Sequence, residues 1–328
     1  MGALLGALLV SYLLAAGYTL WLNPEVRFWT QAYEKKASWA DDLSNQGKRK
    51  LVFVGGSSCA FQIDAGALTK QHGIPSVNMG MAAGMSPRAL AATGLTVVRP
   101  GDVLVIAIEP GLLLEKPDLT PMGYQILTST GILLHPGDAK IAIGKLHWAD
   151  FVSSMRPGLY NIATMMGKVF LRRDLYRYGA EDIQPGGGLS TKVSANNEPF
   201  AVVELNPDPT TMKWLQEIDF WCVDHQITVY YLIPQQLFKN SDQIPAQQEN
   251  RKFLKQIAQI VPIAPEASFG VLTDSSEFAD TSLHLTRDGQ ERRTRALVDS
   301  LRQILLAQST PDNQAGPKIQ RRPFEIQR

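Results

Sequence analysis

A run of uncharged, apolar residues at the amino terminus places the strongest constraint on this chain. Residues 2–22 read GALLGALLVSYLLAAGYTLWL, and the first charged side chain is Glu25. A helix of about 20 apolar residues matches the hydrocarbon thickness of a bilayer. Tyr18 and Trp21 near the end of the run are typical of a membrane interface. The sequence therefore predicts that residues 1–24 form a retained transmembrane helix.

Two other interpretations of this run remain open. A cleaved secretory signal normally has a basic start and a shorter apolar stretch, and only the small residues at 14–17 favour one here. The run can also be a buried helix of a domain core. The orientation is open as well, because Arg27, Lys35 and Lys36 follow the run, and positive charges favour the cytoplasmic side.

The composition suits one large domain beside this helix. The chain has 328 residues, 45% of them hydrophobic, which is enough for a sizeable core. A formal net charge of +1 excludes a chain-wide nucleic-acid-binding surface, which needs a clearly basic domain. Cys59 and Cys222 are too few for a disulfide framework or a CxxC zinc pair, although a single bridge remains open. We interpret Cys59 as a small buried thiol.

Short apolar runs alternate with helical patterns along most of the chain. Strands are predicted at 51–54, 76–78, 103–108 and 228–233, and helices at 58–71, 87–98, 209–225, 246–260 and 286–306. This alternation indicates an α/β fold with a mostly parallel, doubly wound sheet. We assign residues 25–47 to a loose helical connector, 48–308 to the domain, about 112–200 to an insertion beside the site, and 309–328 to a disordered polar tail.

The first segment with candidate chemistry is VFVGGSS at 52–58. A buried strand ends in Gly55 and Gly56, and Ser57 follows at the start of a helix. Ligands bind at the carboxyl edge of open α/β sheets, where a helix start supplies backbone N–H groups. Ser57 is therefore a candidate nucleophile. A phosphate loop is excluded here because the pattern GxxxxGK[ST] is absent.

The second segment is VNMGMAAG at 77–84, which follows another short strand. Asn78, Gly80 and Gly84 are candidates for an oxyanion hole, because a glycine N–H can approach a developing negative charge closely. The glycine spacing does not match the dinucleotide pattern GxGxxG.

The third segment is FADTSLHLTRDG at 278–289. Asp280 and His284 precede a helix that Thr286 can cap. An acid that orients a histidine, which in turn activates a serine, is the general logic of a catalytic triad. The sequence therefore pairs Asp280 and His284 with the distant Ser57.

Together the three segments resemble the SGNH family, also called GDSL hydrolases, over roughly residues 50–305. Ser57 with the two glycines before it matches the GDS block, Gly84 or Gly80 matches the oxyanion glycine, and Asp280 to His284 matches the DxxH block. The resemblance implies a three-layer α/β sandwich of the flavodoxin-like SGNH type.

The resemblance also implies a serine esterase or O-acyltransferase that uses neither a cofactor nor a metal. Ser57 would attack the ester, with His284 as its base and Asp280 orienting His284. The N–H groups of Ser57 and Gly84 would hold the oxyanion. Anchored relatives imply a single-pass protein with a periplasmic or other extracytoplasmic domain, acting on acyl esters such as those of a cell-envelope polysaccharide.

Three features depart from the family pattern. Gly56 replaces the aspartate of GDS, and the spacing from Asp280 to His284 is one residue longer than in DxxH. The GxND block is absent after Ile108, where Glu109 stands instead, and an ionised carboxylate cannot donate a hydrogen bond. Loss of one oxyanion donor costs about 2.7–4 kcal/mol of transition-state stabilisation. Glu109 is therefore an additional candidate site residue.

Two other functions remain open. A non-catalytic SGNH-like module that binds glycan or scaffolds an envelope complex is favoured by the missing asparagine. A soluble nucleotide-binding α/β protein is disfavoured by the amino-terminal run and by the absent nucleotide patterns.

Overall fold

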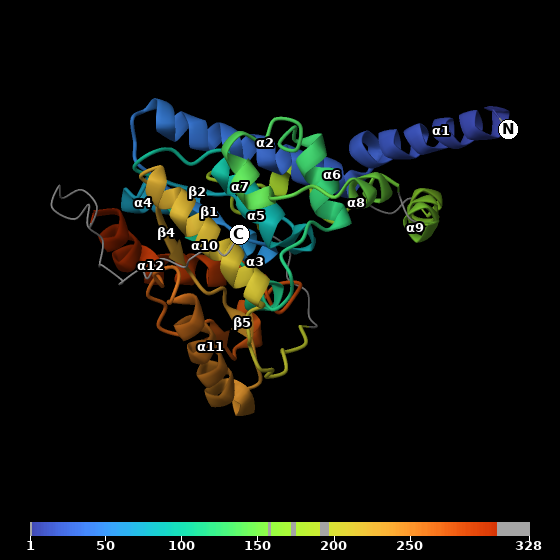
Figure 1. Ribbon diagram of the computed structural model, residues 1–328. Helices are drawn as coiled ribbons and strands as arrows, with labels where there is room; N and C mark the ends of the chain where they lie inside the picture. Colours follow the sequence, from blue (N-terminus) through green and yellow to red (C-terminus); the bar gives the residue numbers. More distant parts are fainter. Residues whose placement is uncertain (1, 157–158, 172–174, 191–196, 307–328) are drawn as a thin grey trace.

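A four-stranded parallel sheet forms the centre of the molecule. The computed structural model describes residues 2–156, 159–171, 175–190 and 197–306 (Figure 1), so the predicted tail at 309–328 lies outside the described residues. The strands are β1 (Leu51–Val54), β2 (Ser76–Asn78), β3 (Val103–Ile106) and β4 (Thr228–Tyr231), in the order β2-β1-β3-β4. The predicted α/β class with a parallel sheet is confirmed.

Both faces of the sheet are buried at β1 and β3, which explains why these two strands are continuous apolar runs. Along β1, Leu51 and Phe53 belong to one core and Val52 and Val54 to the other. Helices α2 (Pro24–Asn45), α5 (Ser86–Leu95), α10 (Pro209–Asp224) and α11 (Gln243–Ile257) contribute to the core that contains Val52 and Val54, which we call the main core. Helices α4 (Ala65–His72) and α12 (Arg287–Leu306) contribute to the core that contains Leu51 and Phe53.

Smaller elements complete the described fold. The remaining α-helices are α1 (Gly2–Gly17), α3 (Ser57–Gln62), α6 (Pro121–Ser129), α7 (Lys140–Ile143), α8 (Trp148–Ser154) and α9 (Leu159–Phe170). Strands β5 (Gln236–Leu237) and β6 (Val271–Leu272) pair in parallel apart from the main sheet. An isolated parallel bridge from Tyr231 to Ile263 adds a further segment beside β4.

The segment assigned to a loose connector is a single packed helix, α2. Asn23 caps it by accepting a hydrogen bond from the N–H of Glu25, and Pro24 occupies the first turn. Its buried residues are Val26, Phe28, Trp29, Ala32, Lys36, Ala40 and Leu43. This one apolar face joins α2 to the main core, so residues 25–47 are part of the domain rather than a flexible link.

The helix predicted over 58–71 is broken into two helices, α3 and α4. Ile63 has an extended backbone, and the Asp64 side chain accepts a hydrogen bond from the N–H of Ala67. Aspartate is a favoured cap residue because its oxygen satisfies a free N–H at a helix start. The cap therefore begins a second helix where the sequence pattern is continuous.

Helix α1 projects from the body of the molecule (Figure 1). The helical segment Gly2–Leu22, in which Tyr18–Leu22 is π-helical, is long and apolar enough to cross a membrane. Only 6% of its apolar window is buried, so this segment is not a helix of the domain core.

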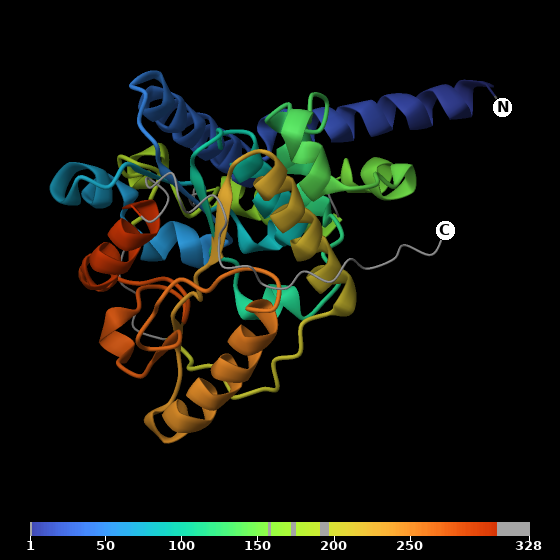
Figure 2. The same ribbon diagram turned by 60° about the vertical axis from the view of Figure 1, so that its left-hand side comes forward.

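The region predicted as an insertion has two different parts. Helices α6 and α7 belong to the main core, where Ile126, Leu127 and Ala142 are buried. Helices α8 and α9 instead extend from the body and lie beside α1 in both ribbon views (Figures 1 and 2). The first part is therefore structural, whereas the second projects toward the predicted membrane helix.

Candidate functional site

The candidate site lies at the carboxyl edge of the sheet, between β1 and β3. From β1 the chain crosses to β2 on one side, and from β3 it crosses to β4 on the other. Such a reversal leaves a crevice outside the strand ends, where ligands of open α/β sheets bind. Ser57 follows β1 and Glu109 follows β3, so the fold brings both candidate residues to this reversal point.

Asp280 and His284 form a buried, hydrogen-bonded pair. The Oδ1 atom of Asp280 lies 2.7 Å from Nδ1 of His284. The Asp280 Oδ2 atom accepts a hydrogen bond of 3.0 Å from the Tyr178 hydroxyl and lies 2.9 Å from an Arg177 guanidinium nitrogen. Burial raises the pKa of Asp280, but the contacts with His284, Tyr178 and Arg177 outweigh it and hold the pKa below its usual value. Asp280 is therefore held ionised and accepts a hydrogen bond from the Nδ1–H group of His284.

A tight hairpin explains how one additional residue between Asp280 and His284 is accommodated. Phe278 and Leu285 form an antiparallel bridge, and the N–H of Ala279 donates to the carbonyl of His284 at 2.7 Å. The Thr281 hydroxyl oxygen accepts the N–H of His284 at 3.1 Å. These bonds fold the loop back, so the longer spacing still places the two side chains in contact.

Stacking places the His284 ring against the helix that carries Ser57. The rings of Phe61 and His284 are 4.1 Å apart and inclined by 26°. Ser57 precedes Phe61 by four residues on α3, and residues at this spacing lie on one helix face with Cβ atoms about 5–6 Å apart. No hydrogen bond joins Ser57 to His284 in the described part of the chain. Catalytic hydrogen bonds are often long without substrate.

Two departures from the family pattern explain each other. Glu109 is buried, and its Oε1 atom accepts the N–H of Ser58 at 3.0 Å. A Cβ atom added at Gly56 would collide with both carboxylate oxygens of Glu109. The Glu109 carboxylate therefore occupies the space beside position 56, where the GDS pattern has an aspartate.

Asn78 and Gly80 have structural roles in this arrangement. The Asn78 amide donates to the carbonyls of Cys59 and Ile63, both at 2.8 Å, and its oxygen accepts the N–H of Gly80 at 2.8 Å. Asn78 is fully buried. Because these protons are already used, Asn78 and Gly80 hold the loop after β2 against α3 and have no free donor for an oxyanion.

Gly84, the remaining glycine candidate, is exposed in a 3-10 turn, Ala83–Met85. Its carbonyl accepts a hydrogen bond of 2.5 Å from the Thr120 hydroxyl, and an added Cβ atom would lie 3.1 Å from Sδ of Met122. Ser57 is the first residue of α3, so its N–H has no partner within the helix.

Lys36 is a buried group at this site that the sequence analysis did not select. It is fully buried on α2 and donates a hydrogen bond to the Gly80 carbonyl. Burial lowers the pKa of Lys36 to about 7. The sequence signal is its spacing, because Ala32 and Ala40 lie four residues on either side on the same buried face. A lysine in such a face marks a polar contact inside the core.

Other chemistry is limited by burial and composition. Both cysteines are free and buried, and burial raises the pKa of Cys59 to about 12, which disfavours the reactive thiolate. Within the described ranges, no group of three or more His, Cys, Asp and Glu side chains comes together as a metal site.

Comparisons with family models, curated proteins and solved structures give no match to this chain.

Proposed function

We propose that this protein is a serine esterase or O-acyltransferase of the SGNH type, with the flavodoxin-like three-layer fold of that family. The observation that carries the proposal is the buried Asp280–His284 pair, stacked on Phe61 one helical turn from Ser57. The strand order and the position of the serine at the β1–β3 reversal point support the same assignment.

In the proposed reaction, His284 Nε2 removes the Ser57 hydroxyl proton while Oγ attacks the carbonyl carbon of an ester. The bond to the alcohol then breaks, and the imidazolium returns its proton to that leaving group. Water or a sugar hydroxyl next attacks the acyl-serine, again losing its proton to His284, and Ser57 is regenerated. The products are a free acid or a new ester.

The Ser57 and Gly84 backbone N–H groups are the proposed oxyanion donors. Because Glu109 accepts the neighbouring N–H of Ser58, it fixes the start of α3 and leaves the Ser57 N–H available. The asparagine of the GxND block is absent from this chain, and Glu109 stands in that region instead. The expected reaction is therefore slower by the worth of one donor, about 2.7–4 kcal/mol in the activation free energy.

The proposed location follows from α1. We place it across a membrane with the domain on the extracytoplasmic side, where esters of a cell-envelope polysaccharide are the proposed substrate. A reporter enzyme that works only outside the cytoplasm, fused after Arg328, is expected to be active. An inactive reporter at normal protein level would contradict this orientation.

Fluorophosphonate labelling tests the proposed nucleophile. The wild-type protein is expected to become covalently labelled, and Ser57→Ala is expected to lose the label. The matched control is Ser58→Ala, since Ser58 is adjacent and its buried hydroxyl has no partner among the described residues. Ser58→Ala alone is expected to keep the label. A protein that stays labelled when Ser57 is replaced by alanine would show that a different serine is the nucleophile.

A second candidate function is a non-catalytic binding module of the envelope. It is favoured by the carboxylate at position 109 and by the absence of a hydrogen bond between Ser57 and His284. A folded wild-type protein that takes no fluorophosphonate label, yet retains an envelope glycan on a column, would support this function instead.

A further inference from the structure

Large apolar side chains are exposed along α8 and α9. Trp148 is 72% exposed and Phe170 is 86% exposed. Among the side chains that the structure describes here, Val152, Met166, Val169 and Leu171 are also apolar and exposed. Burial of one such side chain is worth about 1.5–3 kcal/mol, and contiguous exposed apolar surface is typical of an interaction site. We call this surface the α8–α9 face.

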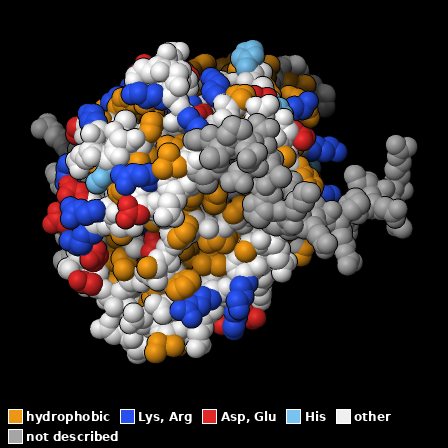
Figure 3. Space-filling model, turned by 90° about the vertical axis from the view of Figure 1, so that its left-hand side faces the viewer, with side chains coloured by type: hydrophobic (Ala, Val, Ile, Leu, Met, Phe, Trp, Pro, Cys, Tyr) orange, Lys and Arg blue, Asp and Glu red, His pale blue; other side chains and the backbone are white. Residues whose placement is uncertain are grey.

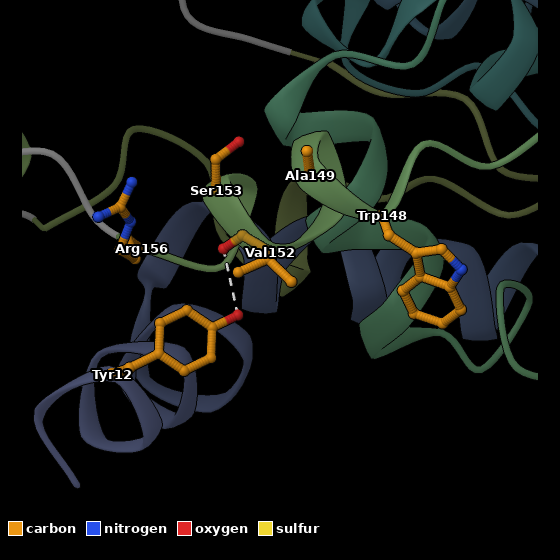
Figure 4. A pocket seen from close by; sticks show the side chains of 6 residues that line it. All are labelled: Tyr12, Trp148, Ala149, Val152, Ser153 and Arg156. Carbon is orange, nitrogen blue, oxygen red and sulfur yellow. Dashed lines mark hydrogen bonds between the residues drawn. The ribbon is translucent and has the colours of Figure 1, made fainter. Parts of the chain in front are cut away.

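Helix α8 contacts α1 well inside the predicted membrane span. The Tyr12 hydroxyl donates to the carbonyl of Val152 at 3.1 Å, and the two helices border a groove of about 480 Å³ (Figure 4). Its lining residues are Tyr12, Trp148, Ala149, Val152, Ser153 and Arg156. The contact therefore joins the α8 part of the α8–α9 face directly to α1.

The depth of this contact decides what surrounds α8. Tyr12 precedes Leu22, the end of the span, by ten residues. At 1.5 Å per residue this is about 15 Å, which is half of a hydrocarbon core of about 30 Å. A span that crosses the membrane therefore brings α8 below the membrane surface on the side of the domain.

We infer that the α8–α9 face is embedded in the lipid of the leaflet nearest the domain, as a second membrane contact beside the span. This inference rests on the membrane-spanning part of the proposed function. Lipid is the favoured occupant because α8 contacts α1, whose leucines are also exposed. The lipid that surrounds α1 would therefore cover the α8–α9 face as well. Arg156 also lines the groove, and its long side chain can extend its guanidinium group toward the membrane interface.

The opposite side of the molecule provides a contrast. Figure 3 shows the side that faces away from α1, where basic and acidic side chains stand beside apolar ones. Helix α11, with the exposed Ile244 near its start, lies at the end of the body remote from α1 (Figure 1). A label at Ile244 therefore reports water even when the α8–α9 face is in lipid.

Spin labelling of the full chain in vesicles of phosphatidylethanolamine and phosphatidylglycerol tests the inference. Single variants Phe170→Cys, Leu9→Cys and Ile244→Cys receive a nitroxide, while Cys59 and Cys222 are buried and stay unlabelled. Collision rates with oxygen, which concentrates in lipid, and with a water-soluble nickel chelate are then compared. All three positions are exposed, so the substitutions leave the core intact.

The expected result is that the Phe170 label resembles the Leu9 label, with strong oxygen collisions and loss of nickel collisions, while the Ile244 label shows the reverse. A Phe170 label that matches Ile244 while Leu9 is in lipid would overturn this inference and leave the membrane span standing. If Leu9 also matches Ile244, the span itself is wrong and the inference fails with it. Spin–spin broadening at Phe170 that disappears on dilution with unlabelled protein would show that a second copy covers the face, and would also overturn the inference.

Discussion

The hairpin that carries Asp280 and the end of β3 that carries Glu109 hold two buried carboxylates in different ways. Asp280 contacts an imidazole, a phenol and a guanidinium. Glu109 accepts one backbone N–H, and its Oε2 atom has no hydrogen-bond partner among the described residues. The first carboxylate is fixed by polar side chains that keep it ionised, whereas the second is fixed by the space that Gly56 leaves open. The contrast indicates an orienting role for Asp280 and a structural role for Glu109.

The largest effect is expected from Asp280→Asn. An asparagine can turn its N–H₂ group toward Nδ1, which moves the imidazole proton to Nε2 and prevents His284 from accepting the Ser57 proton. Hydrolysis of p-nitrophenyl acetate is expected to fall by about 10³-fold or more, since the same change in a serine-protease triad costs about 10⁴ in kcat.

Arg177→Ala is the control for this variant. It removes an exposed cation but leaves Asp280 its bonds to Tyr178 and His284, so the rate is expected to change much less. Equal losses in both variants, with both proteins folded, would show that Asp280 acts only through the ion pair and would break the contrast with Glu109.

The next largest effect concerns Lys36, a buried ionisable group that, like Glu109, has a backbone partner. Its pKa is lowered to about 7 in the folded protein from 10.5, so the unfolded chain binds an additional proton within that window. Stability is therefore expected to rise with pH, by about 2 kcal/mol from pH 7 to about pH 9.

The pH dependence is measured by denaturant unfolding in detergent micelles. Lys36→Met is expected to remove the rise, while the exposed neighbouring variant Lys35→Met is expected to keep it. An unchanged rise in Lys36→Met would mean that another group carries the linkage.

A comparable effect on stability is expected from Gly56→Ala, which tests how Glu109 is held. The added methyl group meets the Glu109 carboxylate, so a loss of about 1–3 kcal/mol of stability is expected from overpacking. In a Glu109→Ala background the same change is expected to cost less, because the space is then free. A double-mutant cycle measures this coupling, and additive losses would contradict the fit between the two positions.

The smallest effect is expected from Glu109→Gln. The glutamine carbonyl can still accept the Ser58 N–H, so the esterase rate is expected to stay within a few-fold of wild type. Glu109→Ala is the informative partner, since it leaves that N–H without an acceptor. A loss in Glu109→Gln as large as that of Asp280→Asn would make Glu109 a participant in the chemistry.

The sheet could be predicted closely from the sequence, but α2 could not. Strand β1 has the predicted bounds, because burial on both faces makes its residues continuously apolar. Helix α2 was recognised as helical but was interpreted as a connector, since its polar face resembles that of an exposed helix. Its burial depends on partners such as α6, which are distant in the sequence.

The site could be predicted only where its contacts are local. Asp280 and His284 lie in one hairpin, so their contact follows from a short spacing. Arg177 and Tyr178 lie about 100 residues earlier, and no pattern in the sequence links them to Asp280. Asn78 was predicted as an oxyanion donor because it follows a short strand in the sequence. The two carbonyls that accept its amide protons become its neighbours only in the folded chain.

Asn23 is the single residue between the helical segment Gly2–Leu22 and helix α2. A protein tied to a bilayer in this way has no tether on which to swing or stretch. The crevice would stay at one distance from the membrane and in one orientation. It could therefore bind only molecules in a thin layer close to the membrane surface. Under the proposed function, a substrate farther from the membrane would have to diffuse into that layer before the crevice could bind it.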